Sequence, residues 1–155
     1  MDGLSGRPGL GQGRIGATPR PLRWVLLFDT RSGQDYLRQL RALGAILAVP
    51  EGEGKYRVFR DLSRQPAVGK VEDLSTIRRI FWIDSKRESV DSLTDALGIK
   101  PPPSHIVAFF PAALEDHLLN KELKYRNRRE EDIRETRFRI VGRGGRYEPE
   151  VEDQR

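Results

Sequence analysis

The stretch Ser104–Tyr125, SHIVAFFPAALEDHLLNKELKY, predicts a buried strand followed by an amphipathic helix. Residues Ile106–Phe110 are apolar at both parities, so both faces of this strand need cover and we expect it to lie inside a sheet. Pro111 cannot continue the strand ladder, but it suits the first helical position. The stripe that the helix is expected to bury consists of Leu114, Leu118 and Tyr125, with Leu119 and Leu123 beside it.

Further strands and helices are predicted outward from this stretch by apolar runs bounded by Gly, Pro and Asp. Ser32 or Thr30 is expected to cap one helix, which ends at Gly44. Ser85 and Glu88 fit a capping box at the start of a second helix. The predicted strands are 23–28, 45–49, 55–60, 80–83, 136–141 and 146–151, the last an edge strand because it contains Pro149.

Together these elements predict an α+β fold with a single mixed sheet of about six or seven strands and three main helices. Residues 1–22 contain six glycines and three prolines without hydrophobic periodicity, so we predict a disordered leader. Residues 23–151 are expected to form one domain, and residues 152–155 a disordered tail.

Two segments of the chain resemble each other. They are LLFDTRSGQDYLRQLRALG, which ends at Gly44, and IFWIDSKRESVDSLTDALG, which ends at Gly98. A duplicated β-α-β unit would place Asp29 and Asp84 at equivalent strand ends, with both helices on one face of a shared sheet. Ordinary capping and helix-stop residues explain the same pattern, so both interpretations stay open.

The composition excludes several classes of protein. The 155 residues contain no cysteine, which excludes disulfides, thiol catalysis and Cys-ligated zinc. No apolar run approaches the roughly 18 residues that suggest a membrane span. The N-terminus also lacks the apolar segment of a secretory signal. We therefore expect a cytoplasmic protein without a membrane segment in this chain, while an anchor upstream of Met1 stays open.

The net charge of +5 is concentrated near the N-terminus. Residues 1–24 carry a net charge of +3, residues 25–100 carry +2 and residues 101–155 carry 0. A nucleic-acid-binding protein usually gathers its positive charge on one face or stripe of the folded domain. Nucleic acid is therefore not the expected partner.

Two loops that join a strand to a helix are the candidate ligand sites. Backbone N–H groups at the start of a helix can hold a phosphate, and a nearby cation can add to the attraction. Neither loop has the spacing of a known nucleotide-binding motif, so capping alone explains the same residues. The candidates are Asp29, Thr30, Arg31 and Ser32 in the first loop, and Asp84, Ser85 and Lys86 in the second.

The sequence contains no recognisable catalytic or metal-binding constellation. His105 and His117 are the only histidines, and His117 has no strong ligand three or four residues away on its helix. We expect no metal and no other cofactor, and enzymatic activity is left open but not favoured. An RNA-stacking face would be formed by Arg57, Phe59, Arg137 and Phe138, although core packing explains these aromatics better.

Several short motifs are similar to those of small proteins from planctomycete bacteria to which no activity is attached. The likeness covers roughly residues 24–151 and implies one compact domain. It transfers no catalytic residue. The motifs are Trp24…Phe28, Tyr36…Gln39-Leu40…Gly44, Phe109-Phe110-Pro111, Glu115…Leu118…Glu122 and Ile133-Arg-Glu-Thr-Arg-Phe138.

Three functions are compatible with these features. The first is a non-enzymatic interaction module that meets a protein partner through the edge strand near Arg146–Val151. The second is binding of a phosphorylated small molecule or nucleotide at the two candidate loops, which requires that both loops open onto one pocket. The third is RNA binding through the basic leader.

Overall fold

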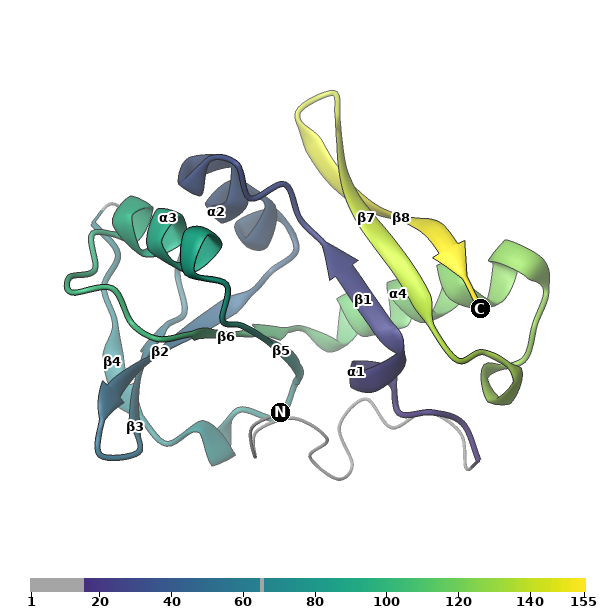
Figure 1. Ribbon diagram of the computed structural model, residues 1–155, viewed down its shortest axis with the longest axis horizontal. Coiled ribbons are helices and arrows are strands. Elements are labelled where there is room, and N and C mark those ends of the chain that lie inside the picture. Colours follow the sequence, from purple (N-terminus) through teal and green to yellow (C-terminus); the bar gives the residue numbers. More distant parts are fainter. Residues whose placement is uncertain (1–15, 65) are drawn as a thin grey trace.

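The computed structural model describes residues 16–64 and 66–155 and has an α+β architecture with two sheets (Figure 1). The strands are β1 Trp24–Leu27, β2 Ile46–Gly52, β3 Lys55–Phe59, β4 Lys70–Glu72, β5 Ile80–Asp84, β6 Ile106–Phe110, β7 Thr136–Arg143 and β8 Arg146–Gln154. The helices are α1 Arg20–Arg23, α2 Gly33–Ala42, α3 Arg87–Leu97 and α4 Ala112–Arg126, with short 3₁₀ helices η1 Leu74–Thr76 and η2 Glu130–Asp132.

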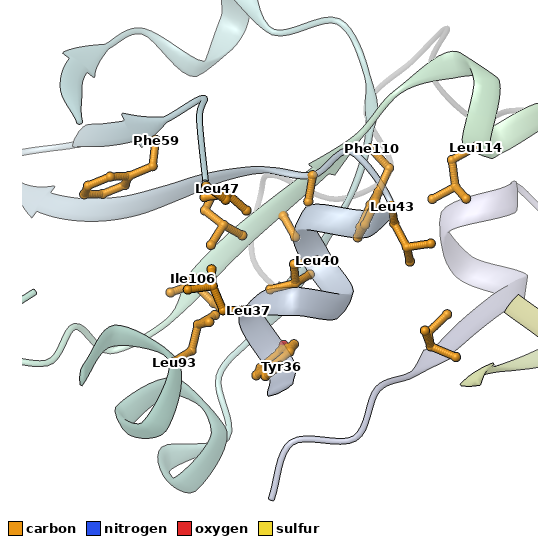
Figure 2. Close-up of a cluster of buried hydrophobic side chains, with 14 of the residues drawn as sticks. Tyr36, Leu37, Leu40, Leu43, Leu47, Phe59, Leu93, Ile106, Phe110 and Leu114 are labelled. Atoms are coloured by element: carbon orange, nitrogen blue, oxygen red, sulfur yellow. The ribbon is translucent and has the colours of Figure 1, made fainter. Parts of the chain in front are cut away.

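The larger sheet has the strand order β4-β3-β2-β6-β5, and all its neighbours are antiparallel. Every residue of β6 is buried, which confirms the prediction of an interior strand. One face of β6 packs under α2 and α3, where Phe110, Leu40 and Leu93 share a core (Figure 2). On the other face Val107 and Phe109 pack against β2, β3, β5 and the segment around η1. Both faces are covered because β6 carries no polar side chain that could face water.

The smaller sheet has the order β1-β7-β8, with β1 parallel to β7 and β7 antiparallel to β8. The prediction of a single sheet is therefore wrong in this respect. β1 and β5 are the end strands of their two sheets and share no ladder. The Trp82 indole and a cavity lie between them, as described below.

Both predicted domain limits need correction within the described residues. The helix α1 begins at Arg20, inside the predicted disordered leader, and the charged groups of Arg20 and Arg23 bind acids of α4 and η2. The rest of the leader, residues 1–15, lies outside the described residues. The predicted tail 152–155 is also ordered, because β8 extends to Gln154 and the backbone of Arg155 exchanges hydrogen bonds with that of Glu135.

The two similar segments share local structure but not topology. Each strand is followed by an Asp whose carboxylate accepts from the backbone N–H two residues on, and each helix ends near a glycine with positive φ. β1 belongs to the smaller sheet, whereas β5 pairs antiparallel with β6. A shared sheet of duplicated parallel β-α-β units is therefore wrong, although α2 and α3 do lie side by side on one face, as predicted (Figure 1).

The close contact between α2 and α3 depends on Gly33. A Cβ atom at this position would lie 2.0 Å from the carbonyl oxygen of Ser92, which no side chain can tolerate. This contact fixes the start of α2 beside α3, so the two candidate loops that precede these helices are held near each other.

Two local predictions about helix ends have different outcomes. Ser32 caps α2 as predicted, and its hydroxyl accepts from the backbone N–H of Asp35 at 3.3 Å. The capping box of Ser85 with Glu88 is wrong, because Lys86 occupies the cap position and no side chain caps the helix there. The Asp84 carboxylate accepts from the backbone N–H of Lys86 at 2.9 Å and takes over this role.

The predicted stripe of α4 is correct in its first half only. Leu114 and Leu118 are buried, but Tyr125 is 42% exposed. Glu122 takes the buried position instead, and it is completely shielded from solvent. A buried carboxylate needs a charged partner, so this position leads to the ion pairs described in the next section.

Candidate functional site

A cavity of about 460 Å³ lies between β1 and β5, and we call it the groove. Consecutive residues of both strands line it, from Trp24 to Phe28 and from Trp82 to Lys86. Because side chains alternate between the two faces of a strand, this pattern means that strand edges border the groove. β6 contributes Ile106, Ala108 and Phe110, which alternate along the strand, so one face of β6 forms the apolar floor.

The edges of β1 and β5 that border the groove lie outside both sheets. β1 pairs with β7 and β5 with β6, and each is the last strand of its sheet. Backbone groups along a strand point alternately to its two sides. Since the carbonyl of Trp24 accepts a bond from Trp82 across the groove, the N–H and C=O of Leu26 are expected on the groove side too. The groove therefore offers backbone hydrogen-bonding groups above an apolar floor.

One end of the groove is closed by the Trp82 side chain and by α1. The indole Nε1 of Trp82 donates to the backbone carbonyl of Trp24 at 3.1 Å and so crosses from β5 to β1. Pro21 and Leu22 of α1 line the groove at the base of β1. The indole N–H of Trp24 is buried and has no hydrogen-bond partner among the described residues. The Trp24 ring packs against Phe138 and the guanidinium groups of Arg20 and Arg23, so this donor is enclosed by the protein.

The other end is a polar rim built around Asp84. Its carboxylate accepts from the Tyr36 hydroxyl at 2.8 Å and from the Ser89 hydroxyl at 2.8 and 3.0 Å. Burial and the neighbouring Asp84 carboxylate raise the pKa of Tyr36 far above its ordinary value, so the phenol keeps its proton. The rim therefore holds α2, β5 and α3 together through one carboxylate.

Four of the seven candidate residues line the groove. Thr30 comes from the first loop, and Asp84, Ser85 and Lys86 come from the second. The two loops thus open onto one cavity, as the phosphate hypothesis requires.

The other three candidates, Asp29, Arg31 and Ser32, do not line the groove. The Arg31 side chain is 90% exposed and bonds the carboxylate of Asp29. Through this hydrogen bond Arg31 lowers the pKa of Asp29 to about 2. The backbone N–H and C=O of Asp29 are both bonded by the buried side-chain amide of Gln39, at 2.9 and 2.8 Å. The Gln39 bonds and the Asp29–Arg31 ion pair therefore order the loop. Because the two charges neutralise each other, the ion pair leaves little net charge to attract an anion.

A second polar cluster, which we call the ion-pair network, lies on the opposite side of β1. The guanidinium of Arg23 bonds both carboxylate oxygens of Glu122, at 2.9 and 2.6 Å, and one of Glu130 at 2.6 Å. Arg20 bonds Glu130 at 3.1 Å and also Glu115. The network fastens α1, which precedes β1, to α4 and η2.

The ion-pair network has no open access for a ligand. Arg23 and Glu122 are completely buried, and the Thr136 hydroxyl fills a further position on Glu122 at 2.7 Å. Burial alone would raise the pKa of Glu130, but the hydrogen bonds from Arg20 and Arg23 outweigh burial and lower it. Glu130 is thus held ionised as a structural partner of the two arginines.

The described residues offer no metal centre and no membrane span. No group of three or more His, Asp or Glu side chains within residues 16–64 and 66–155 is placed to hold a metal ion. His117 bonds Glu148 on the surface, and His105 lies between Tyr56 and Ser104. No helix in this part of the chain has the length and apolar character needed to cross a membrane.

Two surfaces considered for partners have clear positions in the fold. Phe59 and Phe138 are buried in the core, so the arrangement of Arg57, Phe59, Arg137 and Phe138 as an RNA-stacking face is excluded. β8 is an edge strand, as expected, and it carries acids that pair with arginines of β7. Binding of a partner at Arg146–Val151 stays a prediction.

The residues that sequence reasoning missed are Trp24, Trp82, Tyr36 and Ser89. The two tryptophans lie in apolar strands, where core packing is the usual explanation of an aromatic residue. Only the strand order shows that these strands end their sheets, and the sequence does not contain that order. Tyr36 and Ser89 lie in the first turn of the helices that follow the candidate loops, and this closeness in sequence was a local signal that could have identified them.

No protein-family profile, curated protein or solved structure matches this chain.

Proposed function

We propose that this protein is a binding module that takes up an extended polypeptide segment in the groove, paired with the free edge of β1. The observation that carries this proposal is that two strand edges without a ladder border one apolar cavity of about 460 Å³. An added strand satisfies backbone groups on the edge, and its alternate side chains enter the apolar space beneath. An interaction module remains the leading function, but at β1 instead of β8.

The chemistry of the two edges favours β1 over β8. The β1 sequence WVLL is apolar throughout, whereas β8 reads RYEPEVEDQ. Charged side chains and proline are the usual devices that keep an edge strand from pairing with another chain. β8 therefore has the composition of an edge that is protected against pairing. β1 lacks such residues, and only its position beside the groove shields its edge.

The segment that fits is short, extended and apolar at alternate positions. β1 has four residues, so at about 3.3 Å per residue the paired length is about 13 Å. The floor under this length is formed by Ala108 and Phe110, which accept apolar side chains. The rim at Thr30 and Lys86 meets the polar part of the segment as it leaves the groove.

The test is selection from a library of random peptides of about seven residues, followed by N-methylation of each position of a selected peptide. Pairing with one edge predicts that N-methyl groups weaken binding at every second position, because alternate N–H groups point to β1. Uniform insensitivity to N-methylation, or no selected peptide at all, would overturn the proposal.

The chain offers a matched pair of variants for this test. Leu22 is 51% exposed and lines the groove, whereas Val71 is 49% exposed on β4, away from it. We expect Leu22→Ala to weaken binding of the selected peptide severalfold and Val71→Ala to leave it unchanged. Neither truncation removes a core side chain, so both should leave the thermal midpoint within the range of surface substitutions.

A phosphorylated small molecule is the second candidate, because Thr30, Ser85 and Lys86 share the groove rim. The Asp84 carboxylate in the same rim and the apolar floor oppose a polyanion there. The measurement is titration calorimetry with inorganic phosphate and with ATP, on the wild type and on Lys86→Ala. Saturable binding that Lys86→Ala removes would favour this second candidate over a peptide.

A further inference from the structure

Each sheet has one end strand at the groove and one end strand away from it. β1 and β5 border the groove, whereas β8 and β4 contribute no residue to its lining within the described part of the chain. A single strand placed between β1 and β5 would give the continuous order β8-β7-β1-occupant-β5-β6-β2-β3-β4. Among the described strands, β8 and β4 would then be the two ends of one joined sheet.

The composition of the four end strands fits this joined order. The outer strand β8, RYEPEVEDQ, contains a proline and several charged residues, and two of the three residues of the outer strand β4, KVE, are charged. Of the strands at the groove, β1, WVLL, has no charged residue, and β5, IFWID, has one at its rim end. Charge and proline keep an exposed edge from pairing. The two outer edges contain these residues, whereas the two groove edges have the composition of strands that are paired on both sides.

Both groove edges are accessible over corresponding stretches of the two strands. On β1 Trp24 is buried, but Val25–Leu27 is half-buried. On β5 Phe81 is buried, but Trp82–Asp84 is half-buried. Solvent therefore reaches both strands from the closed end of the groove to its rim, in contrast to β6, which is buried throughout.

The two edges run in the same direction and lie too far apart to pair with each other. At the closed end the Trp82 indole donates to the carbonyl of Trp24 at 3.1 Å. Toward the rim, the ring of Phe28 lies 5.6 Å from that of Tyr36, whose hydroxyl bonds Asp84. Because an indole side chain lies between the two edges, they are separated by more than the spacing of about 4.8 Å between neighbouring strands. A strand inserted on the rim side of this indole has one edge on each of its sides.

An extended segment in this groove needs hydrogen-bond partners on both of its sides. Its backbone N–H and C=O groups point alternately toward β1 and toward β5. Pairing with β1 alone would turn half of these groups toward β5 inside an apolar cavity, where an unpaired polar group costs free energy. Since β5 is an end strand with edge groups of its own, a second ladder satisfies that half.

We propose that the occupant of the groove is one uncharged extended segment of a partner protein, which pairs with β1 and β5 at the same time and joins the two sheets into one. This inference rests on the proposed function, because it concerns the same groove. The paired part of the segment is uncharged because apolar side chains surround the middle of the groove, while the charges of Asp84 and Lys86 lie at its rim.

The leader and a second copy of this chain are weaker occupants than such a partner. Residues 9–15, GLGQGRI, precede α1, but their three glycines weaken strand pairing. A second copy would have to offer its outer strands β4 or β8, whose charged residues do not fit an apolar cavity. A partner segment rich in β-branched or aromatic residues has neither disadvantage.

The experiment places an isotope-labelled peptide, selected from the random library, on the full chain and measures its contacts by NMR. We expect nuclear Overhauser effects from its backbone protons to Val25–Leu27 on one side and to Trp82–Asp84 on the other. N-methylation should weaken binding about fivefold at positions of both parities, because each paired N–H bonds one of the two edges. Positions of the peptide outside the groove are the internal control and should not respond.

Amide hydrogen exchange of the protein gives a second readout that needs no variant. In the complex, the amide of Leu26 and alternate amides of Trp82–Asp84 should exchange at least about tenfold more slowly than in the free chain, because they donate to the peptide. The amides of β4 serve as the matched control at an edge away from the groove, and their exchange should not change.

The outcomes separate the two proposals. No selected peptide, or insensitivity to N-methylation at every position, overturns the proposed function itself. Contacts and slowed exchange on β1 alone overturn the second ladder, whatever the N-methyl pattern, and leave the proposed function in place. Self-association that Leu22→Ala abolishes would assign the groove to a second copy of this chain, and contacts of residues 1–15 with both edges in the free chain would assign it to that segment. Either result overturns the partner segment as occupant.

Discussion

The two sides of β1 differ in how they contact the rest of the molecule: one borders a closed cluster of ion pairs and the other borders an open apolar groove. On one side the ion-pair network of Arg20, Arg23, Glu115, Glu122 and Glu130 fastens α1 to α4 and η2. On the other side the edge of β1 borders the groove, whose floor is apolar. The charged side is filled and closed, whereas the apolar side is open.

Under the proposed function, this difference means that the charged side chains do not mark the side of β1 that binds a partner. Buried charges cost too much free energy to be left unpaired, so the arginines and glutamates of the network satisfy one another. The apolar groove leaves backbone groups along the edge of β1 without a ladder. Under the proposed function, the binding site therefore lies along an apolar strand and not at the charged cluster.

The largest effect is expected from breaking the ion-pair network. Glu122→Gln keeps the shape of the side chain but leaves Glu130 as the only charged partner of the buried Arg23. We expect it to lower the free energy of unfolding by about 1.5–3 kcal/mol, because the hydrogen bonds between Arg23 and the Glu122 carboxylate are lost as bonds between charged groups. Urea unfolding of the wild type and the variant measures this loss.

Glu148→Gln provides the matched control for that substitution. Glu148 is a half-exposed acid that pairs with His117 and Lys121 on the surface. Its replacement should cost about 0–1 kcal/mol, as exposed ion pairs usually do. A loss at Glu122 as small as the loss at Glu148 would contradict the contrast between the network and an ordinary surface pair.

The network also explains where sequence reasoning failed. Arg23 lies at the start of a predicted strand and Glu122 on a predicted helix, and a charged residue at either place alone indicates a solvated position. Their pairing joins residues 99 apart in the chain, and no local pattern carries that information. The same limit applies to the two sheets, since strand order depends on contacts between distant segments.

What could be predicted came from local patterns with a direct physical cause. The fully apolar Ile106–Phe110 required cover on both faces, and Ser32 capped α2 because its hydroxyl reaches a free N–H. The candidate loops predicted only part of the groove lining. Asp84 and Thr30 do line one cavity, but the apolar floor and the tryptophans beside them depend on tertiary packing that no loop sequence specifies.

A smaller effect on the charged side is expected from acid. The arginines hold the pKa of Glu130 below its ordinary value of 4.5, despite the opposing effect of burial. A carboxyl whose folded pKa is lowered adds stability above its unfolded pKa and loses it as the pH falls through the folded pKa. The network should therefore weaken below pH 4.5.

The measurement is the free energy of unfolding from about pH 6 down to about pH 3 for the wild type and for Glu130→Gln. Other carboxyls also titrate in this range, so the difference between the two proteins is the relevant quantity. The difference in the free energy of unfolding should shrink as the pH falls, because protonation of Glu130 removes from the wild type the negative charge that the variant already lacks. A difference that stays constant would show that Glu130 does not contribute through its charge.

Filling the groove is expected to have an effect of the opposite sign. Ala108 lies on the floor, and Ala108→Leu places apolar atoms in the cavity. We expect a gain of about 0.5–2 kcal/mol, as for other cavity-filling substitutions, together with loss of peptide binding. The control is Ala48→Leu on β2, where the side chain is fully buried in the opposite face, and overpacking there should cost about 1–3 kcal/mol. Equal effects at the two alanines would contradict an open groove.

The smallest change in stability is expected at the β8 edge, which has the opposite character to the β1 edge. Pro149 interrupts the row of N–H groups, and Glu152 adds charge that pairs with Arg139. Pro149→Val with Glu152→Val removes one proline and one charge, and the free energy of unfolding should change by only about 0.5 kcal/mol. The variant should nevertheless self-associate more strongly than the wild type in sedimentation velocity, because an edge without these devices can pair with a second copy. If the variant self-associates no more than the wild type, composition does not explain why the two edges differ. The preference of a partner strand for β1 would then have to come from the shape of the groove alone.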